Sequence, residues 1–408
     1  MLGALAGVAA SQIAGAGWVR RVEFMAYDRL SALCAEPALA ASSRVQLVLM
    51  DAGDPADPIA PPRSRWGELI ELLARRRPKA IVLDLLMADP SPHGEPDDRS
   101  LAARLLSAGR VILPAGNGRH PVLAAGGSGI PAGSAVPVYG RTEFLQGVAS
   151  LLLPERRLVE AALRVGVASI RPDGTGGQVV RRVPVAFAVA GEFVPSLPVA
   201  AVMTAFDESS LNIAGAGRLL QGFAGLDLPL DPEANLLLNF RGPRGSFRAI
   251  SAASLSAAML DPGSARRALR RIKPRDILVL GLNPSGSPGR EDEHATPTDP
   301  AMPGPEVLAT AIDNLIRGDV RRMAAPALLR LLPVLFGCAV GFLLTFSRRR
   351  LGRLLAAALL PLYLAGAAWL FREGFVLEFV TPPLSGLLAV LAVVCLTRKP
   401  EEAEQAAA

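Results

Sequence analysis

Two aspartates stand at the ends of short apolar runs that are typical of buried β-strands. Asp51 closes the run Val45–Met50, and Asp84 follows the run Ala80–Leu83. The carboxyl ends of parallel strands share one edge of a sheet, which is where α/β proteins place ligands. Carboxylates there can bind a cation, work as an acid–base pair, or accept backbone N–H groups. All three roles stay open, and both residues are candidates for ligand binding.

Two further candidates lie later in the chain. Arg241 follows a strand-like run and can either pair with a buried carboxylate, which we favour, or contact a ligand. Asp292 lies in the long Gly/Pro-rich loop Gly281–Pro303, where a solvated position is the alternative to ligand contact. The start of that loop, Gly281–Gly286, resembles a phosphate cradle but lacks the Gly-Lys-Ser/Thr ending, so we expect a turn.

The pattern contains no set of residues that indicates an enzyme. His93, His120 and His294 lie in polar loops, and no two have the spacing of zinc ligands. A nucleophile with a neighbouring base is not recognisable. We therefore predict no catalytic residue, no metal site and no cofactor.

The elements that must position these residues follow an α/β order. Strand-like runs and helical patterns alternate from residue 45 to residue 113, which favours parallel pairing. We expect strands at Val45–Met50, Ala80–Leu83, Val111–Leu113, Val165–Ile170, Val179–Val189, Asn235–Phe240 and Ile277–Leu280. We expect helices at Trp66–Arg76, Asp98–Ala108 (capped by Asp97 or Asp98), Pro195–Thr204, Ala252–Met259 and Glu306–Ile316.

Three apolar runs near the end of the chain are each about long enough to cross a bilayer, at ~20 residues per span. The predicted transmembrane helices are residues 328–346, 354–371 and 375–396. The link between the first and second spans is rich in arginine, whereas in the link between the second and third spans Arg372 is balanced by Glu373. Positive residues favour the cytoplasmic side, so the first link should be cytoplasmic. Residues 20–325 then form an external domain, residues 397–408 a short cytoplasmic tail, and residues 1–19 an N-terminal transmembrane helix. A truncated helix or a signal peptide is the alternative for residues 1–19.

Composition agrees with a membrane-anchored α/β protein. Half of the residues are hydrophobic. The net charge is +6, and almost all of the positively charged residues are arginine. An arginine-rich coding bias and the inside-positive rule explain this charge, and no aromatic-interleaved basic stripe suggests nucleic acid. Cys34, Cys338 and Cys395 provide no disulfide framework, because the last two fall within predicted spans. We expect membrane lipid, but not nucleic acid, among the partners.

A series of short motifs resembles the type 2 CHASE domain, a sensory extracellular module associated with cyclases and histidine kinases. In chain order the motifs are Tyr27-Asp28-Arg29-Leu30, the strand end Leu47–Asp51, Pro62-Arg63, Ile81–Asp84, Asp97 to Pro114, Asp173-Gly174 with Arg181-Arg182, Pro195-Ser196-Leu197, Asn239-Phe240-Arg241-Gly242, Thr296-Pro297 and Pro303-Gly304-Pro305-Glu306-Val307. The resemblance covers about Met25 to Leu396. It implies an α/β fold with a mixed sheet and flanking helices, and it adds Arg63 to the candidate ligand-binding residues.

Two departures from the family pattern concern polar positions. Ala52-Gly53-Asp54 follows Asp51 where the family often has an acidic residue and a serine. The last helix reads Leu308-Ala309-Thr310 where the family often has His-Ala-Asn. The resemblance therefore implies a ligand site that is altered or lost. In the family a kinase or cyclase domain commonly follows the spans, and here none does.

Three hypotheses follow for a protein of the bacterial inner membrane with a periplasmic main domain. The first is a sensory receptor that passes a signal to a separate protein partner. The second is a non-catalytic structural or accessory subunit of a membrane complex. The third, an envelope hydrolase using Asp51 and Asp84, is the least favoured. A homodimer is compatible with the first two, because the family resemblance implies dimers.

Overall fold

The computed structural model describes residues 2–13, 15–51, 61–118, 130–170, 178–255, 269–283, 292–346 and 349–405. The chain forms two compact units. The sheet unit comprises Ala35–Asp173 and Gln178–Val320. The helical unit comprises Met1–Cys34, Gly174–Gly177 and Arg321–Ala408.

The sheet unit is built on one mixed seven-stranded sheet. In spatial order its strands are β15 (Ala249–Ser251), β1 (Val45–Asp51), β16 (Ile277–Asn283), β2 (Ala80–Leu83) and β3 (Val111–Gly118), with β7 (Arg164–Val167) and β6 (Ser150–Leu152) both paired to β3. Every pair is parallel except β3 with β6. The predicted parallel pairing is confirmed. However, β16 lies between β1 and β2, although more than 190 residues separate it from β2 in the chain.

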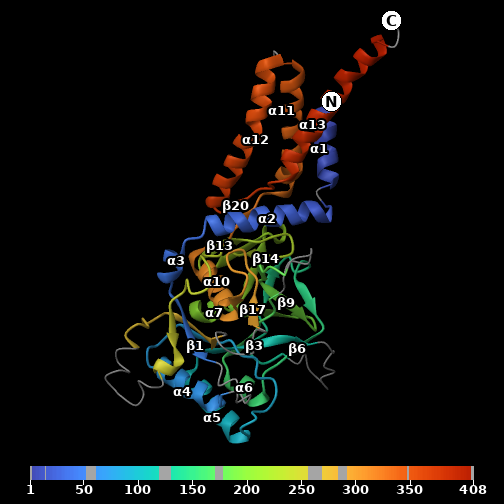
Figure 1. The fold of residues 1–408 in the computed structure, drawn as a ribbon. Helices are drawn as coiled ribbons and strands as arrows, with labels where there is room; N and C mark the ends of the chain where they lie inside the picture. Colours follow the sequence, from blue (N-terminus) through green and yellow to red (C-terminus); the bar gives the residue numbers. More distant parts are fainter. Residues whose placement is uncertain are drawn as a thin grey trace. The chain divides into compact units, whose positions relative to one another are not determined.

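Helices cover both faces of this sheet (Figure 1). One face carries α4 (Arg63–Ala74) and α5 (Glu95–Ala108), and the other carries α7 (Leu197–Phe206) and α10 (Gly304–Arg317). Successive residues of a strand point to opposite faces. Accordingly, Ile81 and Leu83 pack with α4 and α5, whereas Ala80 and Val82 pack with α7 and α10. This double coverage explains why the strands read as continuous apolar runs.

Smaller sheets and short helices complete the unit. One sheet has the order β10 (Glu192–Pro195), β9 (Ala186–Val189) and β5 (Gln146–Val148), and another has the order β13 (Leu226–Pro229), β12 (Leu219–Phe223), β11 (Leu211–Ala214) and β4 (Val138–Gly140). Two strand pairs are β14 (Asn235–Leu237) with β8 (Arg182–Pro184), and β17 (Glu293–His294) with β18 (Met302–Pro303). The short helices are α3 (Pro37–Ala41) and α6 (Arg156–Ala161). The prediction of one strand over Val179–Val189 is wrong, because β8 and β9 belong to different sheets. Of the predicted helix Ala252–Met259, residues 252–255 are helical and residues 256–259 lie outside the described part.

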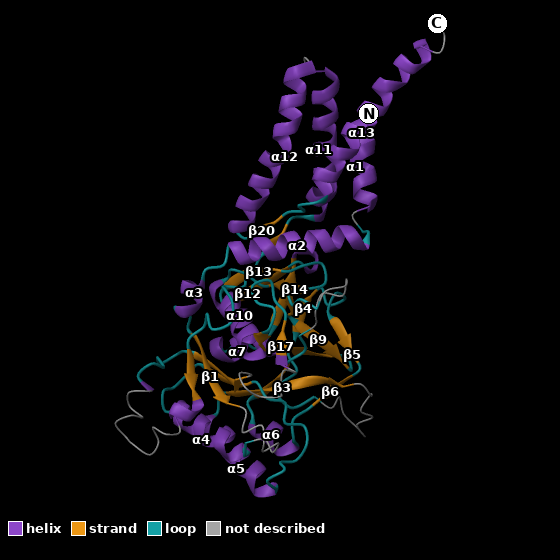
Figure 2. Cartoon of the chain, viewed as in Figure 1, coloured by secondary structure: helices purple, strands orange, loops and turns teal. Residues whose placement is uncertain are grey.

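The helical unit contains α1 (Leu2–Ile13), α2 (Gly17–Leu33), α11 (Pro326–Phe346), α12 (Arg349–Arg372) and α13 (Thr381–Gln405), with the short strands β19 (Arg322–Met323) and β20 (Phe375–Val376). Figure 2 shows α11 and α12 side by side as a helical hairpin. Over the described residues, Pro326–Thr345 and Arg350–Arg372 are helical stretches long and apolar enough to cross a membrane. These two segments agree with the first two predicted spans.

The third C-terminal span needs correction, and the N-terminal segment is bent. The run 375–396 is not one helix, because its first residues form β20, which pairs with β19, and α13 starts only at Thr381. Its apolar part, Thr381–Cys395, is shorter than the two spans. At the N-terminus, α1 ends at Ile13 and the axis of α2 is turned by 87° from that of α1. Taken together, α1 and α2 are long and apolar enough for one bent span, so a transmembrane helix at the N-terminus stays a prediction.

Glycines bring α1 and α11 into backbone contact. A Cβ on Gly3 would overlap the backbone of Gly337, and a Cβ on Gly7 would overlap the backbone of Val334. Gly3 and Gly7 are four residues apart, as are Gly337 and Gly341. This small-xxx-small spacing places the two glycines of each helix on one face, and it is a common way for membrane helices to pack closely.

Candidate functional site

Asp84 lies at the carboxyl edge of the central sheet, directly after β2. Its backbone N–H donates a hydrogen bond of 2.7 Å to Leu280 O of β16, which fixes its position beside the neighbouring strand. The side chain is half-buried and faces a cavity. The sequence therefore located this carboxylate correctly, at the end of a buried parallel strand.

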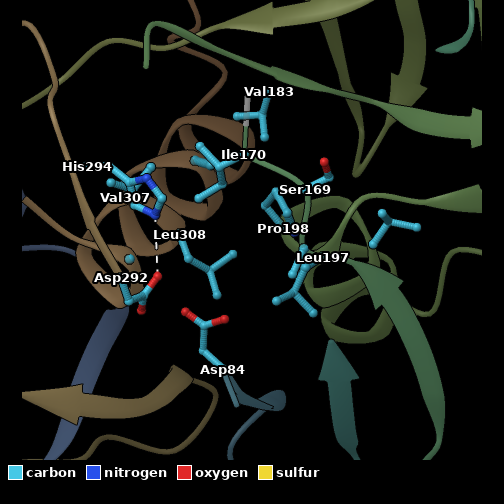
Figure 3. A pocket seen from close by; sticks show the side chains of 14 residues that line it. Asp84, Ser169, Ile170, Val183, Leu197, Pro198, Asp292, His294, Val307 and Leu308 are labelled. Carbon is cyan, nitrogen blue, oxygen red and sulfur yellow. Dashed lines mark hydrogen bonds and ion pairs between the residues drawn. The ribbon is translucent and has the colours of Figure 1, made fainter. Parts of the chain in front are cut away.

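The cavity at this edge has a volume of about 140 Å³. Figure 3 shows Asp84 pointing toward Leu308, with the Asp292–His294 pair on one side and Leu197 and Pro198 on the other. The polar lining comes from Asp84, Ser169, Asp292 and His294, and the remaining lining is mostly aliphatic: Val167, Ala168, Ile170, Val183, Leu197, Pro198, Val307, Leu308 and Ala311. With about 30 Å³ per water, the space suits a few waters or one small organic molecule.

Asp292 and His294 form one polar wall of the cavity. His294 Nε2 lies 3.3 Å from Asp292 Oδ1. The carboxylate of Asp292 lies against Gly304, the first residue of α10, where an added Cβ would overlap it. Because a helix N-terminus favours negative charge, this is a stabilising position for a carboxylate. The two acidic residues Asp84 and Asp292 thus face one small space.

The surroundings of Asp84 change its acidity. Burial among aliphatic side chains disfavours the charged form, and the nearby Asp292 carboxylate adds repulsion. Together these effects raise the pKa of Asp84 to about 7, with His294 acting in the opposite direction. At neutral pH the carboxyl group can therefore either donate a hydrogen bond or carry a negative charge.

Two strand glycines allow α7 and α10 to approach the sheet at this edge. A Cβ on Gly166 of β7 would collide with Leu197 at the start of α7. A Cβ on Gly281 of β16 would collide with Pro305 at the start of α10. The first turns of both helices therefore form part of the cavity wall. The sequence did not identify either glycine as part of the site.

Asp51 is not a neighbour of Asp84. In the sheet register Asp51 is paired with Asn283 of β16, whereas Leu83 is paired with Leu280. Since β16 lies between β1 and β2, the two aspartate backbones are about two strand spacings apart, roughly 10 Å across the sheet. The register therefore gives no support to the proposed acid–base pair.

Arg63 is engaged in an intramolecular network. Its Nη1 donates to Asp98 Oδ1 at 2.5 Å and its Nη2 donates to Asp89 O at 2.6 Å. Asp97 accepts the backbone N–H groups of Arg63 and Ser64, both at 2.8 Å. The predicted capping of α5 by Asp97 or Asp98 is wrong, because the N-cap of α5 is Gly94 and Asp97 binds the first turn of α4 instead. A ligand contact for Arg63 stays a prediction.

Arg241 lies close to buried carboxylates, as we favoured from the sequence. Its Nε is 3.6 Å from Asp313 Oδ2, and its Nη2 pairs with Asp319. The fully buried Asp313 also accepts hydrogen bonds from Ser43 and Arg317. This group fastens α10 to the start of β1. Arg241 does not line the Asp84 cavity.

Leu308 shows where one of the departures from the family pattern lies in the fold. It is the position where the family often has histidine, and its side chain lines the cavity beside Asp84. Tyr27, from the first motif, packs edge-on against Phe371 at 5.3 Å between ring centroids within the helical unit. The first motif residue therefore contributes to packing, whereas the Leu308 departure falls within the candidate site.

Several sequence predictions lie outside the described residues. They concern His120, Ala52-Gly53-Asp54, Asp173-Gly174 and residues 284–291 of the loop after Asn283; for Asp51 the backbone alone is described. Across the described part of the chain, no cluster of three or more His, Cys, Asp or Glu side chains is arranged to hold a metal ion.

Comparison with known proteins agrees with the motifs. The family model of the CHASE2 domain matches residues 3–346. Searches of curated proteins and of solved structures each returned no match. The CHASE2 domain is an extracellular sensory domain rather than a catalytic one. Because the matched residues cover most of the chain, the protein belongs to the CHASE2 domain family.

Proposed function

We propose that this protein is a membrane-anchored sensor whose sheet unit binds a small ligand in the Asp84 cavity. The observation that carries the proposal is a small, mostly aliphatic cavity whose lining includes two carboxylates and one histidine. Such a site suits a molecule of a few heavy atoms with an apolar part. Its acidic side favours an amino group or another hydrogen-bond donor.

Ligand binding can be tested on the full chain in neutral detergent. The probes are straight-chain primary amines from ethylamine to hexylamine, added at equal ionic strength. A ligand that binds only the folded state raises the melting temperature by mass action. We expect stabilisation to peak at one chain length, because the cavity is small, and to be lost in Asp84→Asn. Stabilisation that is equal in the wild type and in Asp84→Asn would contradict the proposed site.

The orientation of the chain is part of the same proposal. Arg350 and Arg353 lie at the start of α12, after the link that follows α11, and this favours a cytoplasmic link. The sheet unit would then lie on the periplasmic side of a bacterial inner membrane. Alkaline phosphatase fused after residue 150 should be active, and the same enzyme fused after residue 350 should be inactive. The reverse pattern would refute this orientation.

We further propose that the signal passes to a separate protein partner. A sensor needs two states with different affinity for its ligand, and the partner must respond to one of them. Purification of the complex in mild detergent from its native host tests this point. A kinase, cyclase or response regulator at fixed stoichiometry is the expected result, and candidate ligands should change its activity.

A structural or accessory subunit is the second candidate, favoured by one observation. Leu308 places an aliphatic side chain in the cavity at a position where the family often has histidine. A cavity that has lost its polar ligand contacts could persist only as a packing feature. In that case no amine stabilises the protein, Asp84→Asn leaves complex assembly intact, and the co-purifying chains are those of a larger membrane complex.

A further inference from the structure

A second opening lies at the opposite edge of the central sheet. The parallel strands β1, β16 and β2 are neighbours, and Val45, Ile277 and Ala80 are aligned at their amino ends. The residues immediately before these strands are therefore brought together, although the chain separates them widely. Arg44 precedes β1, and Lys79 precedes β2.

Four cationic side chains line this opening, which has a volume of about 410 Å³: Arg44, Lys79, Arg275 and Arg317. Its lining contains no acidic residue. The last turns of α7 and α10 complete the wall with Phe206, Ile316 and Arg317. Lys79 Nζ lies 4.1 Å from the centre of the Phe206 ring, which holds the ammonium group at the opening.

Two acidic residues near this cluster, Asp276 and Asp313, are engaged in hydrogen bonds, and Asp276 also interacts electrostatically with Arg44. Asp276 accepts hydrogen bonds from the side chain of Gln46 and the backbone of Lys273. Asp313 binds Arg317, which also donates to Leu39 O at 3.1 Å. By contrast, no ion pair is formed by Arg44, Lys79 or Arg275 with any described residue. Like charges around one opening repel each other, and a bound anion would remove that repulsion.

We propose that this opening is an anion site for a phosphate group. Four cations around one space favour a ligand with more than one negative charge, and guanidinium groups match the geometry of phosphate oxygens. The phosphate can belong to a soluble diphosphate or to the headgroup of an anionic phospholipid. This site is separate from the Asp84 cavity, and the two have no lining residue in common.

The test uses the full chain and two probes. Inorganic pyrophosphate is titrated calorimetrically into protein held in zwitterionic nanodiscs, with sodium chloride matched for ionic strength because exposed charges are screened by salt. Nanodiscs containing phosphatidylglycerol are then compared with purely zwitterionic ones by melting temperature. The double variant Arg44→Gln/Lys79→Gln removes two of the four cations. Arg65→Gln is the control, because Arg65 is an exposed cation on α4 that does not line the opening.

The proposal expects the double variant to weaken binding by at least about tenfold, since hydrogen bonds to charged groups are among the stronger ones. If the wild type responds to pyrophosphate and the double variant does not, the ligand is a soluble anion. If the same difference is seen with phosphatidylglycerol, the ligand is a lipid headgroup. The proposal is overturned if neither probe responds in the wild type, or if Arg65→Gln weakens binding as much as the double variant. These results are independent of amine binding at Asp84, so the two sites can fail separately.

Discussion

The carboxylate of Asp292 occupies the space that a side chain at Gly304 would need. This relationship places a negative charge at the N-terminus of α10 and on the wall of the Asp84 cavity. Gly304 was read in the sequence only as part of a Pro-Gly-Pro motif before a helix. In the fold it is the residue that lets Asp292 reach the cavity.

Gly304→Ala should move Asp292 away from the cavity. Because the Asp292 side chain is 60% exposed and can turn toward solvent, the cost in unfolding free energy should stay below about 1 kcal/mol. Stabilisation by the best amine should nevertheless fall several-fold, as measured by melting temperature in a concentration series. Gly147→Ala in β5 is the matched control, because a Cβ there meets no atom within 4 Å. Unchanged amine binding in Gly304→Ala would show that Asp292 is not a ligand contact.

The raised pKa of Asp84 predicts a specific pH dependence of stability. A carboxyl group whose pKa is raised in the folded state binds its proton more tightly there than in the unfolded chain. The stability from this group is complete below about pH 4 and is lost as the pH rises through about 7. Asp84→Asn should therefore match the wild type near pH 4, gain on it as the pH rises, and exceed it by about 4 kcal/mol at pH 8, because each unit of pKa shift is equivalent to about 1.4 kcal/mol.

Denaturant unfolding at several pH values measures this difference. Trp66 is fully buried in α4 and reports on the sheet unit, once Trp18 and Trp369 are replaced by phenylalanine. A difference between the two proteins that stays constant from pH 4 to pH 8 would mean that Asp84 does not titrate in this range.

Arg63→Met should destabilise the sheet unit strongly. The substitution leaves the nearly fully buried Asp98 carboxylate without its cation, and removing one partner of a buried ion pair typically costs about 3–5 kcal/mol. Arg99→Met removes an exposed helix pair with Glu95 and should cost less than about 0.5 kcal/mol. Trp66 fluorescence during denaturant unfolding compares the two. Similar small losses would leave Arg63 available for a ligand role.

Gly337→Leu should separate α1 from α11. A side chain there meets the backbone of Gly3, so the helices must move apart or shift, at a cost of about 1–3 kcal/mol. Gly366→Leu in α12 is the control, because a Cβ on Gly366 meets nothing within 4 Å. The melting temperature in detergent should fall for Gly337→Leu alone. An equal fall for both variants would point to a general effect of leucine in these helices.

The sequence by itself determined the local features of this protein. Alternating strands and helices predicted a parallel α/β sheet, a strand ending before Asp84 located one side of the site, and ordered motifs identified the family. Two of the apolar runs also coincide with helices long enough to cross a membrane. These properties depend on residues close in the chain, through hydrophobic period and length.

Only the tertiary structure decided which distant residues meet. The sequence could not place β16 between β1 and β2, because pairing of distant parallel strands depends on packing by both helical layers. The position of β16 separates Asp51 from Asp84 and places Arg44 and Lys79 at the same edge of the sheet. It also brings α10 to the cavity, which Leu308 and Gly304 line. Likewise, Asp97 caps α4 rather than its own helix, since a side chain bonds whichever backbone the fold brings within reach.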